Sequence, residues 1–142
     1  MEEIGGTERN KVYINGREIK LHGLCHHDVS HLYGRSLSRE EIDYEILTYK
    51  QHNINHIRTS HYPASDYFLE VCDRLGIYVE QENAACFKGD NGFGIYNPPQ
   101  DFLAGFAEMI EGARNHPSVI IWSLANESSF EKLMLSARST AM

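Results

Sequence analysis

The sequence lacks a long hydrophobic run, a cluster of cysteines and an excess of positive charge. No stretch approaches the ~20 consecutive apolar residues that a membrane-spanning helix needs, so we expect no membrane segment. The net charge of −7 predicts repulsion from phosphate backbones and from anionic lipid, so we expect neither nucleic acid nor a membrane surface as a partner. The chain starts with MEEIGGTERN, which is too acidic and polar for a secretory signal peptide.

The three cysteines, Cys25, Cys72 and Cys86, are widely separated and form no CxxC pair. An odd number of scattered cysteines does not describe a disulfide framework. We therefore expect a reducing compartment, and without a signal peptide the expected location is cytoplasmic.

The rest of the composition is that of an ordinary globular domain. The 142 residues are 42% apolar, which is enough for a core, and 23% charged, which is far from a disordered composition. Strand-like and helix-like segments alternate along the chain. Strands are expected at 11–14, 18–24, 55–60, 77–80 and 118–123, and helices at 38–52, 66–75 and 101–115 and from about Phe130.

Local signals set the ends of these segments. Asn15-Gly16 predicts a tight hairpin turn between the first two strands. Ser38 and Glu41 have the spacing of a capping box, and Gly76 stands where a helix-ending glycine belongs. The segment lengths suit right-handed crossovers and therefore an α/β fold with a parallel sheet. Such a sheet is either flavodoxin-like or part of an eight-unit barrel.

Polar and ionisable residues collect just after the strands, where the sites of parallel α/β folds lie. They form four groups: His26-His27-Asp28, Arg58 with His61 and Tyr62, Glu82-Asn83, and Asn126-Glu127. The sequence therefore predicts one site, built at the C-terminal ends of the strands.

Asn126 and Glu127 follow a continuously apolar segment that ends with Trp122. A carboxyl group in apolar surroundings keeps its proton at neutral pH and can donate it to a leaving group. An amide beside it can hydrogen-bond a substrate hydroxyl. The alternative is that both residues only cap a following helix, and spacing alone favours this alternative.

The other groups also have two interpretations each. His26 and His27 point to opposite sides of a strand, so at most one of them faces the site, as a metal ligand or a hydrogen-bond donor. Arg58 either holds a substrate carboxylate or pairs with an acidic neighbour in the fold. The segment 83–99 carries Phe87, Phe93 and Tyr96 among glycines, which suits either sugar stacking or a mobile surface loop.

Three stretches together resemble glycoside hydrolase family 2, the family of the β-galactosidases, β-glucuronidases and β-mannosidases. They are "YINGREIKLHGLCHHD", "HNINHIRTSHYPASDYFLEVCDRLGIYVEQEN" and "RNHPSVIIWSLANES". They follow one another in family order and with family-like spacing, and they cover most of residues 12–128. This joint agreement is far more specific than any one of the motifs.

The resemblance implies a fold, a division into domains and a set of roles. The family's catalytic domain is a (β/α)₈ TIM barrel, so residues 11–142 would be about its first four βα units, preceded by a short β-hairpin. Residues 1–10 would be the end of a preceding β-sandwich domain. Glu127 falls on the family's general acid/base. The substrate-binding positions fall on Asn126, which contacts the sugar 2-hydroxyl, on Arg58, which lies beside the nucleophile, and on His27, His61, Asp28 and Tyr62.

Two departures limit this transfer. Some galactosidases bind magnesium through a Glu and a His after strand three, but those places hold Cys86 and Lys88, so we expect no metal and no other cofactor. The family's nucleophile is a second Glu near the end of strand seven, which we expect outside these residues. Retaining hydrolysis needs two carboxyl groups about 5–5.5 Å apart, so the chain alone should be inactive.

The resemblance therefore implies part of a retaining exo-β-glycosidase with a carbohydrate substrate, most simply a β-galactosidase. The open edges of a half barrel should favour self-association. Two alternatives remain open: a non-catalytic half barrel that binds sugar or is purely structural, and a metal-dependent barrel hydrolase that uses His26, His27 and His61.

Overall fold

The computed structural model describes residues 11–87 and 99–128. Its elements, in chain order, are β1 (Val12–Ile14), β2 (Arg17–Ile19), β3 (Gly23–His26), α1 (Arg39–Gln51), β4 (His56–Thr59), α2 (Asp66–Leu75), β5 (Tyr78–Glu82), α3 (Pro99–Ala113) and β6 (Val119–Ser123). None of the helices in these described parts has the length and apolar character that a membrane crossing requires. The helix expected from about Phe130 lies outside the described residues.

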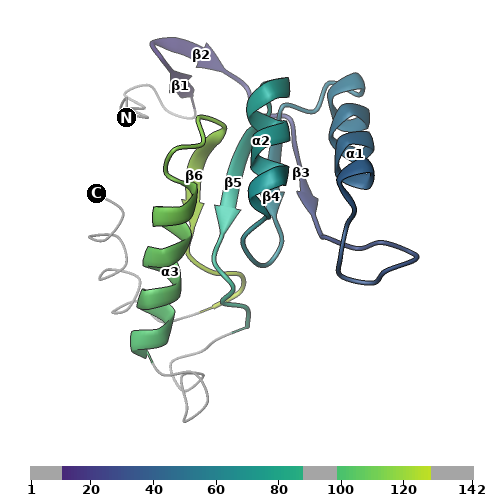
Figure 1. Cartoon of the computed structure of the whole chain (residues 1–142). Helices are drawn as coiled ribbons and strands as arrows, with labels where there is room; N and C mark the ends of the chain where they lie inside the picture. Colours follow the sequence, from purple (N-terminus) through teal and green to yellow (C-terminus); the bar gives the residue numbers. More distant parts are fainter. Residues whose placement is uncertain (1–10, 88–98, 129–142) are drawn as a thin grey trace.

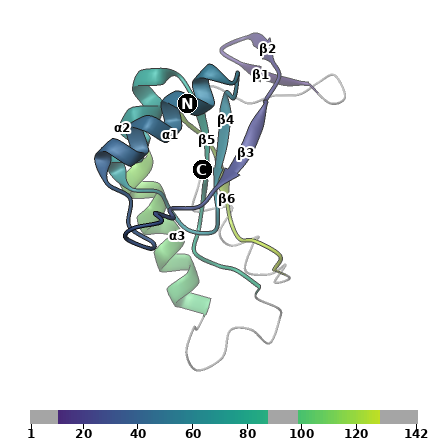
Figure 2. The same cartoon turned by 90° about the vertical axis from the view of Figure 1, so that its right-hand side faces the viewer.

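The core of the fold is a parallel sheet of four strands in the order β3-β4-β5-β6. Each strand pairs with the next one along the chain, and the three helices that connect them lie on one face of the sheet (Figures 1 and 2). A flavodoxin-like sheet has a different strand order and helices on both faces, whereas a barrel wall has sequential strands and helices outside. The structure therefore confirms the expected partial TIM barrel.

The hairpin β1–β2 precedes the sheet and pairs within itself. Its turn residues Asn15 and Gly16 both have positive φ, 52° and 73°. Two positive φ values at the centre of a two-residue turn are the requirement of the type I′ hairpin, which Asn-Gly satisfies at little cost. The predicted hairpin turn is confirmed.

The strand expected at 18–24 is wrong, because the chain divides there into the end of β2 and the start of β3. The side chain of Asn55 explains the break. Its Nδ2 donates to the carbonyl of Lys20 at 2.9 Å, and its Oδ1 accepts the N–H of His22 at 2.7 Å. These two hydrogen bonds replace strand-to-strand hydrogen bonds for the backbone of the connecting residues. β3 therefore begins as a separate strand, the first of the parallel sheet.

The helix ends follow the predicted signals. Ser38 Oγ accepts the N–H of Glu41, and Glu41 Oε2 accepts the N–H of Ser38 at 2.8 Å, which completes the capping box of α1. α2 ends at Gly76, whose φ of 65° is the left-handed conformation that glycine adopts without strain. Both predicted helix boundaries are confirmed.

Two apolar clusters lie between the sheet and the helices. The first joins α1 and α2 to the strands through buried residues that include Ile42, Ile46, Ile57, Phe68, Val71, Cys72 and Val79. The second lies under α3 and contains Ala85, Phe102, Phe106 and Met109, with Trp122 packed against both. Each fully buried large side chain stabilises the fold by about 1.5–3 kcal/mol. The apolar faces of α2 and α3 therefore point into the core.

Two apolar segments are less buried than their sequence patterns suggest. Leu47 is apolar but 46% exposed, because α1 contacts its neighbours through the face of Ile42 and Ile46. β6 is almost continuously apolar, as is typical of a strand covered on both faces, yet all five of its residues are only half-buried. Within the described residues β6 forms backbone hydrogen bonds with β5 alone, so the other edge of this strand has no strand partner.

The carboxylate of Asp73 connects the start of β6 to α2. Asp73 accepts the N–H of Ser118 at 2.9 Å and lies 2.7 Å from His116 Nδ1. Partial burial alone would raise the pKa of Asp73, but these hydrogen bonds outweigh burial and lower it below its ordinary value. The turn between α3 and β6 is therefore held by an ionised carboxylate.

Candidate active site

The C-terminal ends of β3, β4, β5 and β6 all lie at the same end of the sheet (Figure 1). This is the arrangement that the sequence predicted for the four polar groups. The structure connects members of all four groups by hydrogen bonds, and the group at the end of β3 also makes a ring contact with the group after β4.

Glu82, at the end of β5, is the centre of the hydrogen-bond network. Its side chain is fully buried, and Oε2 accepts a hydrogen bond from Nε of Arg58 at 2.7 Å and lies 2.6 Å from Nη2 of the same guanidinium in an ion pair. Oε2 also accepts the hydroxyl of Ser123 at 2.7 Å, and Oε1 lies 2.7 Å from Nδ1 of His61. An ionised carboxylate only accepts, so Nδ1 of His61 carries the proton in this pair. Both oxygens of Glu82 are therefore engaged.

Arg58, on β4, connects this carboxylate to the residues after β6. Its Nη2 also donates to Oδ1 of Asn126 at 2.9 Å, while Nη1 lies 4.0 Å from the sulfur of Cys25 on β3. Partial burial works to lower the pKa of Arg58, but the hydrogen bond and the charge of Glu82 outweigh it and raise the pKa. Of the two interpretations of Arg58, the structure shows the pairing with an acidic neighbour.

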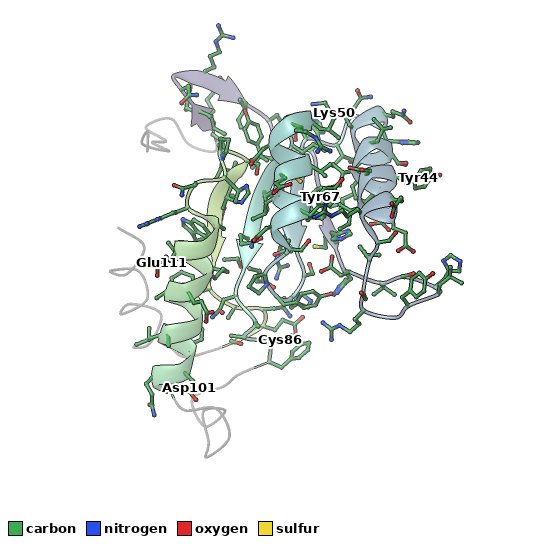
Figure 3. The ribbon with its side chains drawn as sticks, viewed as in Figure 1. Tyr44, Lys50, Tyr67, Cys86, Asp101 and Glu111 are labelled. Carbon is green, nitrogen blue, oxygen red and sulfur yellow. The ribbon has the colours of Figure 1, made fainter. Side chains whose placement is uncertain are left out.

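Asn126 is buried and held on its backbone and on its side chain. Its N–H donates to the carbonyl of Ala85 at 2.8 Å, and its carbonyl accepts the N–H of Phe87 at 3.0 Å. Its side-chain amide donates to the sulfur of Cys86 at 3.5 Å. These contacts continue the pairing of β5 and β6 past the ends of both strands, and Figure 3 shows Cys86 in this extension. Asn126 is thus a fixed point of the site.

Glu127 comes directly after this fixed residue. It is exposed, its φ is 45°, and between described residues its carboxylate forms no hydrogen bond. The apolar enclosure that the sequence led us to expect around this carboxyl group is not built by the described residues. The helix that it would cap in the alternative interpretation lies outside them. Glu127 is therefore exposed at the strand ends.

The two histidines at the end of β3 separate, as the strand period predicts. His26 is buried against the ring of Phe68, with ring centroids 4.9 Å apart, and its Nε2 lies 3.0 Å from Asp28. His27 is exposed and meets the ring of His61 edge to face at 5.2 Å. The structure therefore brings His27 to the network, whereas His26 belongs to the core.

This separation bears on the alternative of a metal site. The three histidines proposed for it are divided between the core and the strand ends, so they do not converge. In the described parts of the chain, no group of three or more His, Cys, Asp or Glu side chains is arranged to hold a metal ion.

Asp28 and Tyr62, two further predicted substrate-binding residues, contact each other. The N–H of Asp28 donates to the Tyr62 hydroxyl at 3.0 Å, and the side chain of Asp28 is paired with His26. The guanidinium of Arg35 stacks over the Tyr62 ring at 4.4 Å. These contacts fix the loop after β3, which carries His27, beside the loop after β4.

The sequence analysis placed Glu82 among the strand-end groups but gave it no role, and it did not include Ser123, Cys25 or Cys86 in the site. One signal could have indicated the role of Glu82. A carboxylate at the end of a buried strand needs a partner, and an arginine stands on the neighbouring strand of the predicted sheet. The roles of Ser123 and the two cysteines depend on the strand register, and no local pattern reveals them.

The match to known proteins agrees with this architecture. Residues 7–140 match the family model described as "Glycosyl hydrolases family 2, TIM barrel domain". The chain belongs to this family.

Among curated proteins, the chain is similar to a beta-galactosidase of Bifidobacterium adolescentis, with 37% identity over 134 residues, which are 86% of this chain and 13% of that protein. A beta-galactosidase of Priestia megaterium is 38% identical over 127 residues, which are 81% of this chain and 12% of that protein. The chain thus spans about an eighth of the length of these relatives.

Solved structures of the family show the same fold. A GH2 beta-galacturonidase from Eisenbergiella tayi, bound to galacturonate, superposes with a TM-score of 0.87 at 28% identity, over 94% of this chain and 25% of that one. A beta-glucuronidase of Faecalibacterium prausnitzii gives 0.85 at 30% identity, over 98% and 25%. The relatives therefore include proteins named for neutral and for acidic sugars.

Proposed function

We propose that this chain supplies the general acid/base and part of the sugar-binding surface of a retaining exo-β-glycosidase, most simply a β-galactosidase. The observation that carries the proposal is the fixed position of Asn126, which leaves the neighbouring Glu127 open at the C-terminal ends of the strands. The identity with two beta-galactosidases supports the choice of sugar.

In this proposal Glu127 acts twice. It first donates its proton to the glycosidic oxygen while a second carboxylate attacks the anomeric carbon, so the bond to the leaving group breaks and a glycosyl-enzyme forms. Glu127, now ionised, then takes a proton from water, and the water oxygen displaces the second carboxylate. The sugar leaves with retained configuration, and Glu127 is protonated again.

The neighbouring residues orient the substrate. The side chain of Asn126 is the proposed partner of the sugar 2-hydroxyl, and Arg58 holds that side chain in place through its hydrogen bond. His27 and His61 present adjacent rings at the strand ends, where imidazole N–H groups can bind hydroxyls. Asp28 and Tyr62 fix the loop that carries His27. No redox cofactor takes part in this reaction.

Glu82 does not fit the role of the nucleophile. A carboxylate that attacks carbon needs a free oxygen at the substrate, but Glu82 is fully buried and both of its oxygens are hydrogen-bonded. The proposal therefore takes its nucleophile from residues that lie outside the strands described here, as the family resemblance implies.

Glu127→Gln in the full-length protein tests the proposal. Proton donation is worth about 10²–10⁴ in rate, so we expect a loss of that size in kcat/KM for lactose, whose leaving group needs a proton. We expect a smaller loss in the first step with 4-nitrophenyl β-galactoside, because nitrophenolate leaves without help. Glu111→Gln, an exposed change on α3, is the matched control. Lactose hydrolysis at the unmodified rate by Glu127→Gln would refute the proton-donor role.

A further inference from the structure

The side-chain amide of Asn126 is held at both of its ends, and the second of these contacts leads to an inference about Cys86. Oδ1 accepts a hydrogen bond from Nη2 of Arg58 at 2.9 Å, and Nδ2 donates to the sulfur of Cys86 at 3.5 Å. A guanidinium has no acceptor, so the atom that faces Arg58 must be the oxygen of the amide. The nitrogen of the amide is therefore on the side of Cys86.

This orientation decides what Asn126 can offer a substrate. Nδ2 carries two hydrogens, and the bond to Cys86 uses one of them. The other hydrogen can be donated to a hydroxyl oxygen. In the proposed function this oxygen belongs to the sugar 2-hydroxyl, which therefore accepts a hydrogen bond from Asn126.

The amide needs both contacts because the torsion that turns it has no sharp preference. The last torsion of an asparagine side chain is broad, unlike the staggered torsions between saturated carbons. Arg58 alone would hold the oxygen and leave the nitrogen free to swing around it. The bond to Cys86 fixes the nitrogen as well, and with it the direction of the second N–H.

The sulfur is itself fixed relative to Asn126 by the backbone. Cys86 and Asn126 form a parallel β-bridge beyond the ends of β5 and β6. The N–H of Asn126 donates to the carbonyl of Ala85, and the N–H of Phe87 donates to the carbonyl of Asn126. The residues directly before and after Cys86 are thus bonded to Asn126, and Cys86, labelled in Figure 3, is half-buried between them. The acceptor is therefore in place before a substrate arrives.

We propose that Cys86 is a positioning residue, whose sulfur holds the amide of Asn126 so that its free N–H can bind the 2-hydroxyl of the sugar. This inference rests on the proposed function, since it concerns a sugar contact of the same site. Hydrogen bonds to the 2-hydroxyl strengthen in the transition state of glycoside hydrolysis. Loss of the orientation should therefore lower kcat/KM for a substrate that carries this hydroxyl more than for one that lacks it. A purely structural role would lower both values alike.

The test compares 4-nitrophenyl β-galactoside with its 2-deoxy analogue on the full-length protein. The measured quantity is the ratio of kcat/KM for the two substrates, in which effects common to both cancel. For the unmodified protein we expect a ratio of at least about 100. Cys86→Ala removes the acceptor and should reduce this ratio by about fivefold, which is the effect of one ordinary hydrogen bond.

Cys86→Ser is the matched variant, because it differs from Cys86→Ala only by a hydroxyl that can accept the bond. We expect it to keep the ratio within about twofold of the unmodified protein. Cys86→Val fills the space of the thiol without an acceptor, and it takes the place of Cys86→Ala if that variant does not fold. Ala84→Ser, an exposed change two residues away, is the control and should leave the ratio unchanged.

A double-mutant cycle shows whether Cys86 acts through Asn126. Asn126→Ala removes the amide, so the further change Cys86→Ala should then leave the ratio as it is. A second reduction of the ratio in the double variant would overturn the inference, because Cys86 would then act by another route.

The outcomes separate the inference from the proposed function. If the unmodified protein cleaves no β-galactoside, the proposed function fails and the inference fails with it. If it cleaves the galactoside, but a folded Cys86→Ala or Cys86→Val protein keeps the unmodified ratio, the function stands and the inference is overturned. An equal reduction of the ratio in Cys86→Ala and Cys86→Ser also overturns it, because the acceptor would then not be the feature that matters.

Discussion

At the scale of single residues, Arg58 illustrates what the sequence leaves open. Its two interpretations, a grip for a substrate or a partner for an acid, differ only in what stands on the neighbouring strand. The partner, Glu82, is 24 positions away in the sequence, and it reaches Arg58 because β4 and β5 are adjacent. A local sequence pattern does not show that two residues so far apart in the chain are neighbours in space. The separation of His26 and His27, in contrast, follows from the strand period and was predicted.

A residue-scale prediction concerns Asp73. Asp73→Asn should weaken the bonds to His116 and Ser118 and reduce the free energy of unfolding by about 1–3 kcal/mol at pH 7. The pKa of Asp73 is lowered in the folded state, so its stabilisation is present above the unfolded pKa and is lost as the pH falls through the folded pKa. The difference between the two proteins should therefore shrink below about pH 4. Urea unfolding from pH 7 downward measures it.

Glu70→Gln serves as the control for this measurement. Glu70 lies on the same helix but is exposed, and such substitutions change stability by no more than about 0.5 kcal/mol. A penalty for Asp73→Asn that is equal at all pH values would contradict the role of the ionised carboxylate.

At the scale of elements, the helices were predictable because their signals are local. Ser38, Glu41 and Gly76 act on backbone groups within one turn, so the sequence contains the whole interaction. The strand at 18–24 failed for the opposite reason, since its interruption depends on the side chain of Asn55, which reaches back from the start of β4. The ends of a strand cannot be predicted from the sequence when they depend on a side chain that is far away in the chain.

The capping box gives the element-scale prediction. Ser38→Ala removes the acceptor for the N–H of Glu41 and should lower the free energy of unfolding by about 1 kcal/mol. Ser36→Ala, an exposed change just before the helix, is the matched control and should have little effect. Thermal or urea unfolding of both variants measures the difference. Equal stability of the two variants would show that the box contributes nothing to α1.

At the scale of the whole molecule, the sequence predicted a parallel α/β fold but left the type of sheet open without the family resemblance. Connection lengths specify a crossover, not the order of strands in space. The strand order β3-β4-β5-β6, with helices on one face only, is that of part of a barrel and not of a flavodoxin-like sheet. In the described residues, β3 pairs with β4 alone and β6 with β5 alone, so each has one side without a strand partner.

The open sides lead to a prediction about residues 1–142 expressed on their own. Unpaired strand edges invite pairing with another chain, so we expect self-association that increases with concentration and no glycosidase activity. Light scattering coupled to size-exclusion chromatography measures it. Ile121→Lys, which puts a charge on the same face of β6 as Ser123, should reduce the association, while Val29→Lys in an exposed loop should not. A monomer at all concentrations would contradict the prediction.

The hairpin β1–β2 lies at the end of the sheet where the parallel strands begin, and the polar network lies where they finish (Figure 1). Asn15 and Gly16 need their positive φ for the turn, but Arg17 beside them is exposed and starts β2. A fluorophore or a surface tether attached at Arg17 would therefore lie at the opposite end of the sheet from Asn126 and Glu127. Ligand titrations could be followed from there without the label competing for the sugar.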